Sequence, residues 1–183
     1  MKTVETTLEG AYVIVPEPYR DSRGSFARIF CKTELKRIGF KKDIQQINHS
    51  LNKEAGALRG MHFQKPPKAE IKFVKCIKGS VCDVIVDIRQ GSDTFLKWFS
   101  EILSAENQYM MYIPEGFAHG FQTLEPGCEL IYFHTERYEP EYEDGIRFDD
   151  PHIGIKWPRD ITMMSDRDKN FPLLSADFRG IAI

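Results

Sequence analysis

Short runs of β-branched and aromatic residues, separated by turn sequences, recur along most of the chain and restrict the folds it can adopt. The segments between them contain Gly, Pro, Ser or Asp, as in Lys78-Gly79-Ser80 and Glu125-Pro126-Gly127. This spacing predicts an antiparallel sandwich or barrel. The runs are Ala11–Val15, Phe26–Cys31, Ile44–Leu51, Ile71–Ile77, Val81–Ile88, Phe95–Leu103, Tyr109–Ile113, Phe121–Leu124 and Glu129–Thr135.

Helix is expected to be a minor component. One clear helix is predicted over Thr33–Ile38, with Thr33 as its N-cap and Gly39 as its stop. Short helical turns are predicted near Ser104–Asn107 and Ser165–Lys169. The fold should therefore be all-β with a few short helices.

The length of 183 residues predicts one domain, residues 1–183, which can bury roughly two thirds of its unfolded surface. No repeat, low-complexity tract or linker interrupts it. The segment Pro140–Pro158 is rich in Pro, Gly and acidic residues, and we expect ordered loop and edge structure there because aromatic side chains such as Trp157 can anchor it.

Charge and cysteine usage exclude several classes of partner. Lys plus Arg number 25 and Asp plus Glu 27, with both signs interspersed, so no nucleic-acid-binding surface is expected. Charged residues interrupt every apolar run, so none approaches the ~20 residues of a membrane span. With no CxxC pair and no secretory signal pattern, we expect a cytoplasmic protein with reduced cysteines, namely Cys31, Cys76, Cys82 and Cys128.

Two segments each place one histidine in an apolar, strand-like stretch with glycines: Leu58–Gln64 contains His62, and Ile113–Phe121 contains His119. A fold that brings them together would form a pocket with proton-transfer groups. On a strand, His62 and Gln64 point to the same face, where one ligand could meet both.

Other polar residues in strand-like runs have more than one interpretation. Asp83 and Asp87 are more consistent with buried salt bridges to Arg or Lys than with catalysis. Lys72 either faces inward, where it could stabilise an anion, or faces solvent. Alternation puts Tyr132 on the same face as His134, and its phenol either acts as a general acid or simply packs with its hydroxyl on a polar group.

The PxGxxH element from Pro114 to His119 resembles the second motif of the cupin superfamily, a double-sheet jelly roll. Many cupins bind a metal through two His and a Glu of the first motif. Here Gln64 stands where the second of those histidines would be, and no clear His/His/Glu set remains. A metal-dependent cupin such as a dioxygenase or isomerase is therefore a lesser alternative, and no metal is expected.

A closer resemblance covers the chain from about Val13 to Asp168. A consistent order of blocks resembles the dTDP-4-dehydrorhamnose 3,5-epimerase family. They are LRGMHFQ, the Lys72 strand, VCDVIVDIR, LSAEN, IPEGFAHGF, the Tyr132 strand, YEPEYEDGIRFDDP, IKWP and MSDRD.

The resemblance implies a jelly-roll homodimer that epimerises a nucleotide-linked 4-keto-6-deoxyhexose without cofactor or metal, with dTDP-4-dehydro-6-deoxyglucose as the leading substrate. Such an enzyme removes a proton alpha to the C4 ketone and returns one on the opposite face. It needs a base, a stabiliser for the enolate and an acid.

The resemblance also implies a role for individual residues. His62 would be the base, with Asp168 orienting it, because a carboxylate on one ring nitrogen sets the tautomer and raises the basicity of the other. Tyr132 would be the acid on the opposite face, and Lys72 would stabilise the enolate oxygen. Arg59 and His119 would hold the sugar diphosphate. The substrate-binding residues implied in all are Arg23, Gln46, Asn48, Arg59, His119, Tyr138, Glu143 and Arg167.

Two positions depart from the family pattern in elements that the resemblance implies contact the nucleotide. Arg28 replaces the usual acidic residue, and Ile47 replaces the Asp of a QDN element. A different nucleotide, or a non-catalytic nucleotide-sugar-binding cupin, is therefore an alternative. Because enzymes that invert only C3 or only C5 share the same acid–base set, the sequence leaves the number of inverted centres open.

Overall fold

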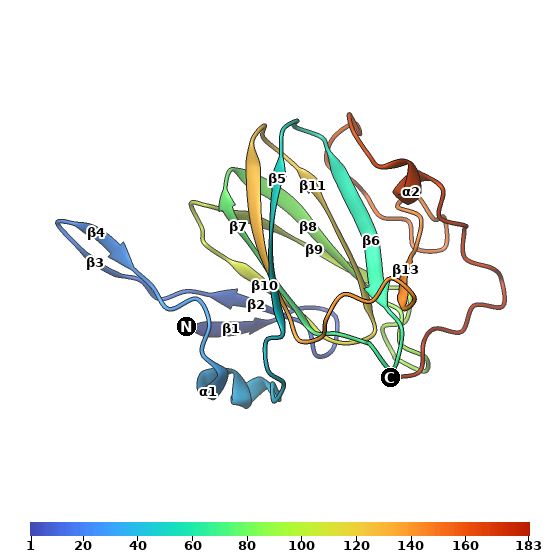
Figure 1. Cartoon of the computed structure of the whole chain (residues 1–183), viewed down its shortest axis with the longest axis horizontal. Helices are drawn as coiled ribbons and strands as arrows, with labels where there is room; N and C mark the ends of the chain where they lie inside the picture. The colour runs from blue at the N-terminus through green and yellow to red at the C-terminus, as the bar shows by residue number, and fades with distance from the viewer.

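The computed structural model describes residues 1–183 and consists mainly of two facing antiparallel sheets (Figure 1). The large sheet has six strands, in the order β1 (Lys2–Glu5), β2 (Tyr12–Val15), β10 (Met110–Ile113), β7 (Lys72–Lys78), β12 (Cys128–His134) and β5 (Gln46–Asn52). The second sheet has five, in the order β13 (Glu143–Gly145), β6 (Leu58–Gln64), β11 (Phe117–Thr123), β8 (Ser80–Asp87) and β9 (Trp98–Ser104). The predicted all-β, double-sheet fold is confirmed.

The remaining elements lie outside the two sheets. A hairpin of β3 (Tyr19–Asp21) and β4 (Gly24–Phe26) projects away from the sandwich (Figure 1). The helices are α1 (Lys32–Leu35), the 3-10 turn η1 (Lys36–Ile38) and α2 (Asp166–Lys169). None has the length and hydropathy to cross a bilayer.

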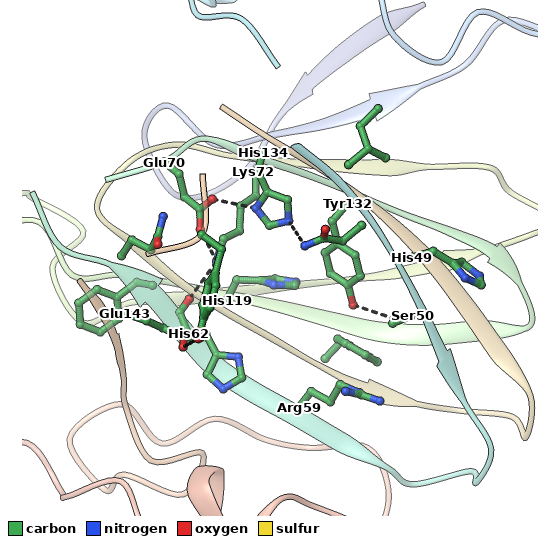
Figure 2. A pocket seen from close by; sticks show the side chains of 16 residues that line it. His49, Ser50, Arg59, His62, Glu70, Lys72, His119, Tyr132, His134 and Glu143 are labelled. Atoms are coloured by element: carbon green, nitrogen blue, oxygen red, sulfur yellow. Dashed lines mark hydrogen bonds and ion pairs between the residues drawn. The ribbon is translucent and has the colours of Figure 1, made fainter. Parts of the chain in front are cut away.

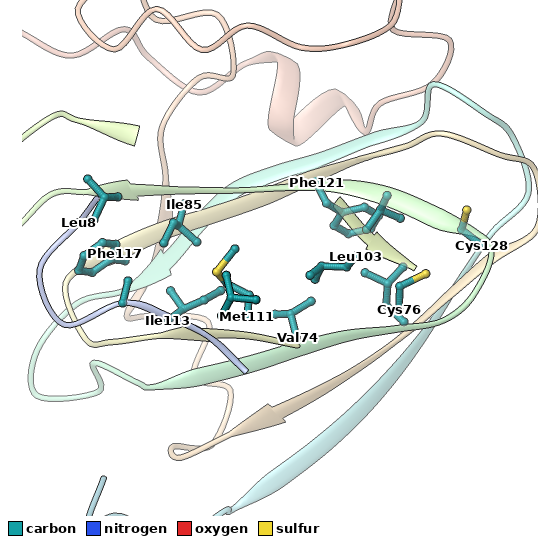
Figure 3. Packing of buried hydrophobic residues seen from close by; sticks show 14 residues of the cluster. Leu8, Val74, Cys76, Ile85, Leu103, Met111, Ile113, Phe117, Phe121 and Cys128 are labelled. Atoms are coloured by element: carbon teal, nitrogen blue, oxygen red, sulfur yellow. The ribbon is translucent and has the colours of Figure 1, made fainter. Parts of the chain in front are cut away.

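Alternation along the strands fills the space between the sheets with apolar side chains (Figure 3). On β7, Val74 and Cys76 belong to this core, and Ile85 and Phe121 meet them from the second sheet. Lys72 shares the inward face of β7 with Val74 and Cys76. Because Lys72 begins its strand, it lies where the core gives way to a cavity.

Further apolar clusters cover the outer faces of the sheets. Leu35 of α1 and Phe40 pack against Phe73 of the large sheet. Residues of the segment 146–181, including Trp157, cover the second sheet. The indole of Trp157 donates to the Phe148 carbonyl at 3.0 Å, so the anchoring predicted for Pro140–Pro158 is confirmed.

Most predicted strands are present, with shifted ends, but two local predictions are wrong. The run Phe26–Cys31 leaves the ladder after Phe26 because Phe30 turns to pack on Phe40, Phe73 and Phe133. The helix of Thr33–Ile38 starts after Cys31, so Thr33 is not its N-cap, whereas Gly39 ends it at φ 83° as predicted. Ser104–Asn107, by contrast, forms the predicted turn, in which the Gln108 amide donates to the Ser104 carbonyl at 2.9 Å.

The other local predictions agree with the structure. Ser165 caps α2 by accepting from the Asp168 amide, which matches the predicted turn at Ser165–Lys169. All four cysteines are free thiols, as predicted.

Candidate active site

A cavity of about 530 Å³ opens between the two sheets and is lined by strands of both. β5, β7 and β12 of the large sheet form one wall, and β6 and β11 of the second sheet form the other (Figure 2). His62 and His119 are direct partners in the β6/β11 ladder, so the fold brings the two histidine segments together.

His62 is bonded to a buried carboxylate. Its Nε2 lies 2.8 Å from Asp168 Oδ1, and Asp168 Oδ2 accepts from the Gly60 amide at 3.0 Å. Although burial opposes ionisation, the bonds from His62 and Gly60 hold the pKa of Asp168 below its ordinary value. An ionised Asp168 keeps the proton on Nε2 and leaves the Nδ1 lone pair of His62 free to accept a proton.

Gly60 makes this arrangement possible because β6 and β11 approach closely there. A Cβ at Gly60 would lie 2.5 Å from Gly120 Cα and 2.7 Å from the His119 carbonyl oxygen, and its φ is +116°. Only glycine fits at such a position.

His119 has its own carboxylate partner. Its Nε2 lies 2.7 Å from Asp83 Oδ1, and both side chains are buried. Burial raises the pKa of Asp83, which His119 opposes, and Asp83 Oδ2 has no partner. The predicted salt bridge of Asp83 to Arg or Lys is therefore wrong, because only the β11 histidine reaches it, whereas Asp87 pairs with Arg89 at 2.7 Å as predicted.

Tyr132 reaches the cavity from the large sheet, whereas His62 lies on the second sheet. Its hydroxyl lies 3.3 Å from Ser50 Oγ, and burial raises its pKa well above the ordinary value. The phenol is therefore protonated at neutral pH and can act as a proton donor.

Lys72 faces inward, which decides between the two orientations left open by its sequence pattern. Its ammonium lies 3.1 Å from Glu70 Oε1 and 3.4 Å from the His62 carbonyl oxygen, and its side chain is 11% exposed. A cation held in this cavity can stabilise a negative charge that develops beside it.

Several predicted substrate-binding residues surround the same cavity. Arg59 lines it and donates to Asn52 Oδ1 at 2.7 Å. Asn48, Tyr138 and Glu143 line it as well, and the Tyr138 hydroxyl donates to Glu143 Oε2 at 2.6 Å.

Two other residues with predicted roles contact residues that line the cavity, and a third lines it without facing a ligand freely. Arg167 reaches Glu143 at 2.5 Å, and Gln46 reaches the cavity residue Asn48 at 3.1 Å. Gln64 lines the cavity, but its amide bonds the backbone of Lys68, Arg137 and Glu139.

Arg23 is the predicted site residue that the chain does not bring to its own cavity. It lies on the projecting β3–β4 hairpin, with its side chain 87% exposed and paired to Asp21 at 2.6 Å. Of the two departures from the family pattern, Ile47 lines the cavity and Arg28 pairs with Glu34.

Glu70 and His134 both line the cavity and lie 2.8 Å apart, although the sequence pattern predicts no role for either. The signal for His134 was its alternation with Tyr132 on one strand face. Glu70 offered no signal, because it lies in the irregular segment before β7.

The arrangement supplies acid–base groups rather than a cluster of metal ligands. No group of three or more His, Cys, Asp or Glu side chains is placed to hold a metal ion. His62 and His119 each direct Nε2 to a separate carboxylate.

Comparison with known proteins agrees with this geometry. The sequence profile of the dTDP-4-dehydrorhamnose 3,5-epimerase family matches residues 5–176. The chain belongs to this family. The dTDP-4-dehydrorhamnose 3,5-epimerase of Methanothermobacter thermautotrophicus is 43% identical over 171 residues, which cover 92% of this chain and 91% of that relative.

Solved structures of the family share the fold of this epimerase-family chain. The dTDP-4-dehydrorhamnose 3,5-epimerase of Bacillus anthracis, with TDP and PPi bound, superposes with a TM-score of 0.91 at 39% identity, covering 94% of this chain and 99% of that one. A 3'-monoepimerase from Streptomyces bikiniensis, in complex with dTDP-quinovose, gives 0.85 at 33% identity, covering 93% and 86%. One fold therefore serves enzymes that differ in the number of centres they invert.

Proposed function

We propose that the protein epimerises a nucleotide-linked 4-keto-6-deoxyhexose, with dTDP-4-dehydro-6-deoxyglucose as the leading substrate. The observation that carries the proposal is the placement of a His–Asp pair and a protonated phenol on opposite sheets of one cavity. A base on one side of a sugar ring and an acid on the other can remove a proton from one face and return it to the other.

The reaction begins at the carbon next to the C4 ketone. His62 Nδ1 takes the proton while Asp168 stabilises the imidazolium that forms. The C4 oxygen then carries enolate charge, which the Lys72 ammonium stabilises. Tyr132 protonates the carbon from the opposite face, and the ketone re-forms with inverted configuration.

The nucleotide part of the substrate lies towards the polar and cationic residues around the cavity. The Arg59 guanidinium has the fork geometry that suits phosphate oxygens, and His119 presents Nδ1 while Asp83 holds Nε2. The exposed ring of Tyr138 offers a stacking surface for the base.

The protein acts as a homodimer in which the β3–β4 hairpin of one protomer reaches the cavity of its partner. The hairpin exposes Tyr19 and Phe26 at 68% and 79%, more than a free surface hairpin of a stable domain would be expected to leave uncovered. Arg23 on its tip is implied in substrate binding yet lies outside its own chain's cavity. A second copy that accepts the hairpin reconciles both observations.

Solvent-deuterium incorporation tests the activity. With dTDP-4-dehydro-6-deoxyglucose in D2O, NMR should show deuterium at C3, C5 or both, and the configuration of each labelled carbon in the product reports how many centres invert. His62→Ala should abolish exchange, whereas His152→Ala, which alters an exposed histidine outside the cavity, should not. Binding without exchange across several nucleotide forms would contradict catalysis and support a non-catalytic binding protein.

Light scattering tests the dimer, and mixing inactive variants tests the shared site. When equal amounts of Arg23→Ala and His62→Ala protomers re-form dimers at random, about half of the dimers are mixed, and one of the two cavities in each mixed dimer receives both native residues, so activity should recover to about a quarter of wild type. A monomer, or a mixture that stays inactive, would contradict the shared site.

A further inference from the structure

Glu70 lies between two cationic or hydrogen-donating groups in the cavity wall. Its Oε1 is 3.1 Å from Lys72 Nζ, and its Oε2 is 2.8 Å from His134 Nδ1. The three side chains are 7%, 11% and 13% exposed for Glu70, Lys72 and His134. His134 and Lys72 are direct partners in the β12/β7 ladder, so they share the inward face, and Figure 2 shows Glu70 beside both.

The hydrogen bonds continue from His134 along β5. Its Nε2 lies 3.4 Å from Asn48 Nδ2, and Asn48 Oδ1 accepts from Gln46 Nε2 at 3.1 Å. The Gln46 Oε1 in turn accepts from the Tyr138 amide at 3.1 Å. An unbroken chain of polar contacts thus joins the segment around Tyr138 to Glu70, and through it to the lysine.

The direction of these bonds defines the tautomer of His134. An amide nitrogen can only donate, so Asn48 Nδ2 requires Nε2 of His134 to accept. The ring proton then lies on Nδ1, where it is donated to Glu70. The geometry therefore describes a neutral imidazole that receives a bond on one side and gives one on the other.

The carboxylate of Glu70 is ionised in this arrangement. Burial opposes ionisation, but the nearby Lys72 ammonium and the bond from His134 hold the pKa of Glu70 below its ordinary value. Without Glu70, the structure would leave the Lys72 ammonium only the His62 carbonyl oxygen at 3.4 Å. A long lysine side chain with one weak contact samples many rotamers, so Glu70 determines where the ammonium lies.

We propose that Glu70 and His134 are positioning residues, which hold the Lys72 ammonium where the enolate charge develops and link it to Asn48 at the substrate-binding end of β5. This inference rests on the proposed function. Glu70 and His134 touch no reacting atom; they act through Lys72.

The first test compares two glutamate variants by steady-state kinetics and deuterium exchange. Glu70→Gln keeps the size of the side chain but removes its charge, and should lower kcat by about 10- to 100-fold, with KM changed by less than about threefold. Glu129→Gln is the matched control. Glu129 also lies between a lysine and a histidine, Lys78 and His49, each at 3.0 Å, but neither Glu129 nor Lys78 lines the cavity, which His49 does. It should leave kcat unchanged.

The second test separates positioning from a structural role. In a Lys72→Ala background, Glu70→Gln should cause no further loss of kcat, because its effect passes through the lysine. At position 134, His134→Asn keeps a donor near the place of Nδ1 and should retain more activity than His134→Leu. Losses that multiply in the double variant, or equal losses for the two His134 variants, would overturn the proposal.

A third measurement needs no substrate and no turnover. Nitrogen-15 NMR of the imidazoles, with the signals of His134 assigned by their absence in His134→Asn, should show the proton on Nδ1 in the wild type. A proton on Nε2 would overturn the proposal. If wild type exchanges deuterium and Glu70→Gln matches it, the inference fails alone; if wild type never exchanges, the proposed function fails.

Discussion

Replacing Asp168 with asparagine should inactivate the protein through the tautomer of His62. The Gly60 amide donates to one oxygen of Asp168 at 3.0 Å, and His62 Nε2 contacts the other at 2.8 Å. An asparagine must present its only oxygen to the Gly60 amide. Its NH2 group then faces His62, so Nε2 must accept and the ring proton moves to Nδ1.

A proton on Nδ1 blocks the atom that should take the substrate proton. Loss of the correct tautomer costs about 10³- to 10⁴-fold in kcat, or about 4 to 5.5 kcal/mol of transition-state stabilisation. KM should change little, because the cavity keeps its shape. Deuterium exchange in D2O measures the loss, and nitrogen-15 NMR of His62 measures the tautomer.

The control is Asp166→Asn, which makes the same chemical change two residues away on a side chain that is 96% exposed. It should leave exchange at the wild-type rate. If the rate of deuterium exchange in Asp168→Asn is within about tenfold of the wild-type rate, or if the proton of His62 remains on Nε2, Asp168 does not set the tautomer that the reaction needs.

Three further predictions concern the acid, the packing and a buried lysine. Tyr132→Phe should slow inversion by about 10²- to 10⁴-fold, while the recovered substrate still gains deuterium because the base remains. If NMR shows that inversion and deuterium incorporation are lost equally, the assignment of Tyr132 as the acid is contradicted. Gly60→Ala should cost about 3 kcal/mol or more in urea unfolding, because the new methyl meets Gly120 at 2.5 Å and φ is +116°. Gly127→Ala, with φ +71° and no neighbour within 4 Å, should cost only about 1 kcal/mol. Burial lowers the pKa of Lys75 from 10.5 to about 8. Above pH 8 the unfolded chain therefore binds more protons than the folded protein, and the free energy of unfolding rises with pH. Between about pH 7.5 and 9.5, the free energy of unfolding measured in urea should gain about 2 kcal/mol from this group in wild type and nothing from it in Lys75→Met. If the free energies of the two proteins change with pH in parallel, the reasoning is refuted.

Local sequence pattern predicted most strands because alternation and turn residues act over a few positions. The near-continuous apolar run around Val84 and the alternation around Tyr132 each lie within a single strand, so β8 and β12 could be predicted from sequence. The local pattern gave wrong predictions where a contact with a residue distant in sequence overrides the local preference. Phe30 is such a case, since it leaves a strand-like run to join an aromatic cluster.

The chain by itself determined the sheet-rich fold class and the family to which its blocks of motifs belong. Only the tertiary structure decided which groups meet. His62 and Asp168 are 106 residues apart, and Glu70 and His134 are 64 apart. No local preference encodes such pairs, because they depend on strand order and register, which place Lys72 opposite His134 and His119 opposite His62.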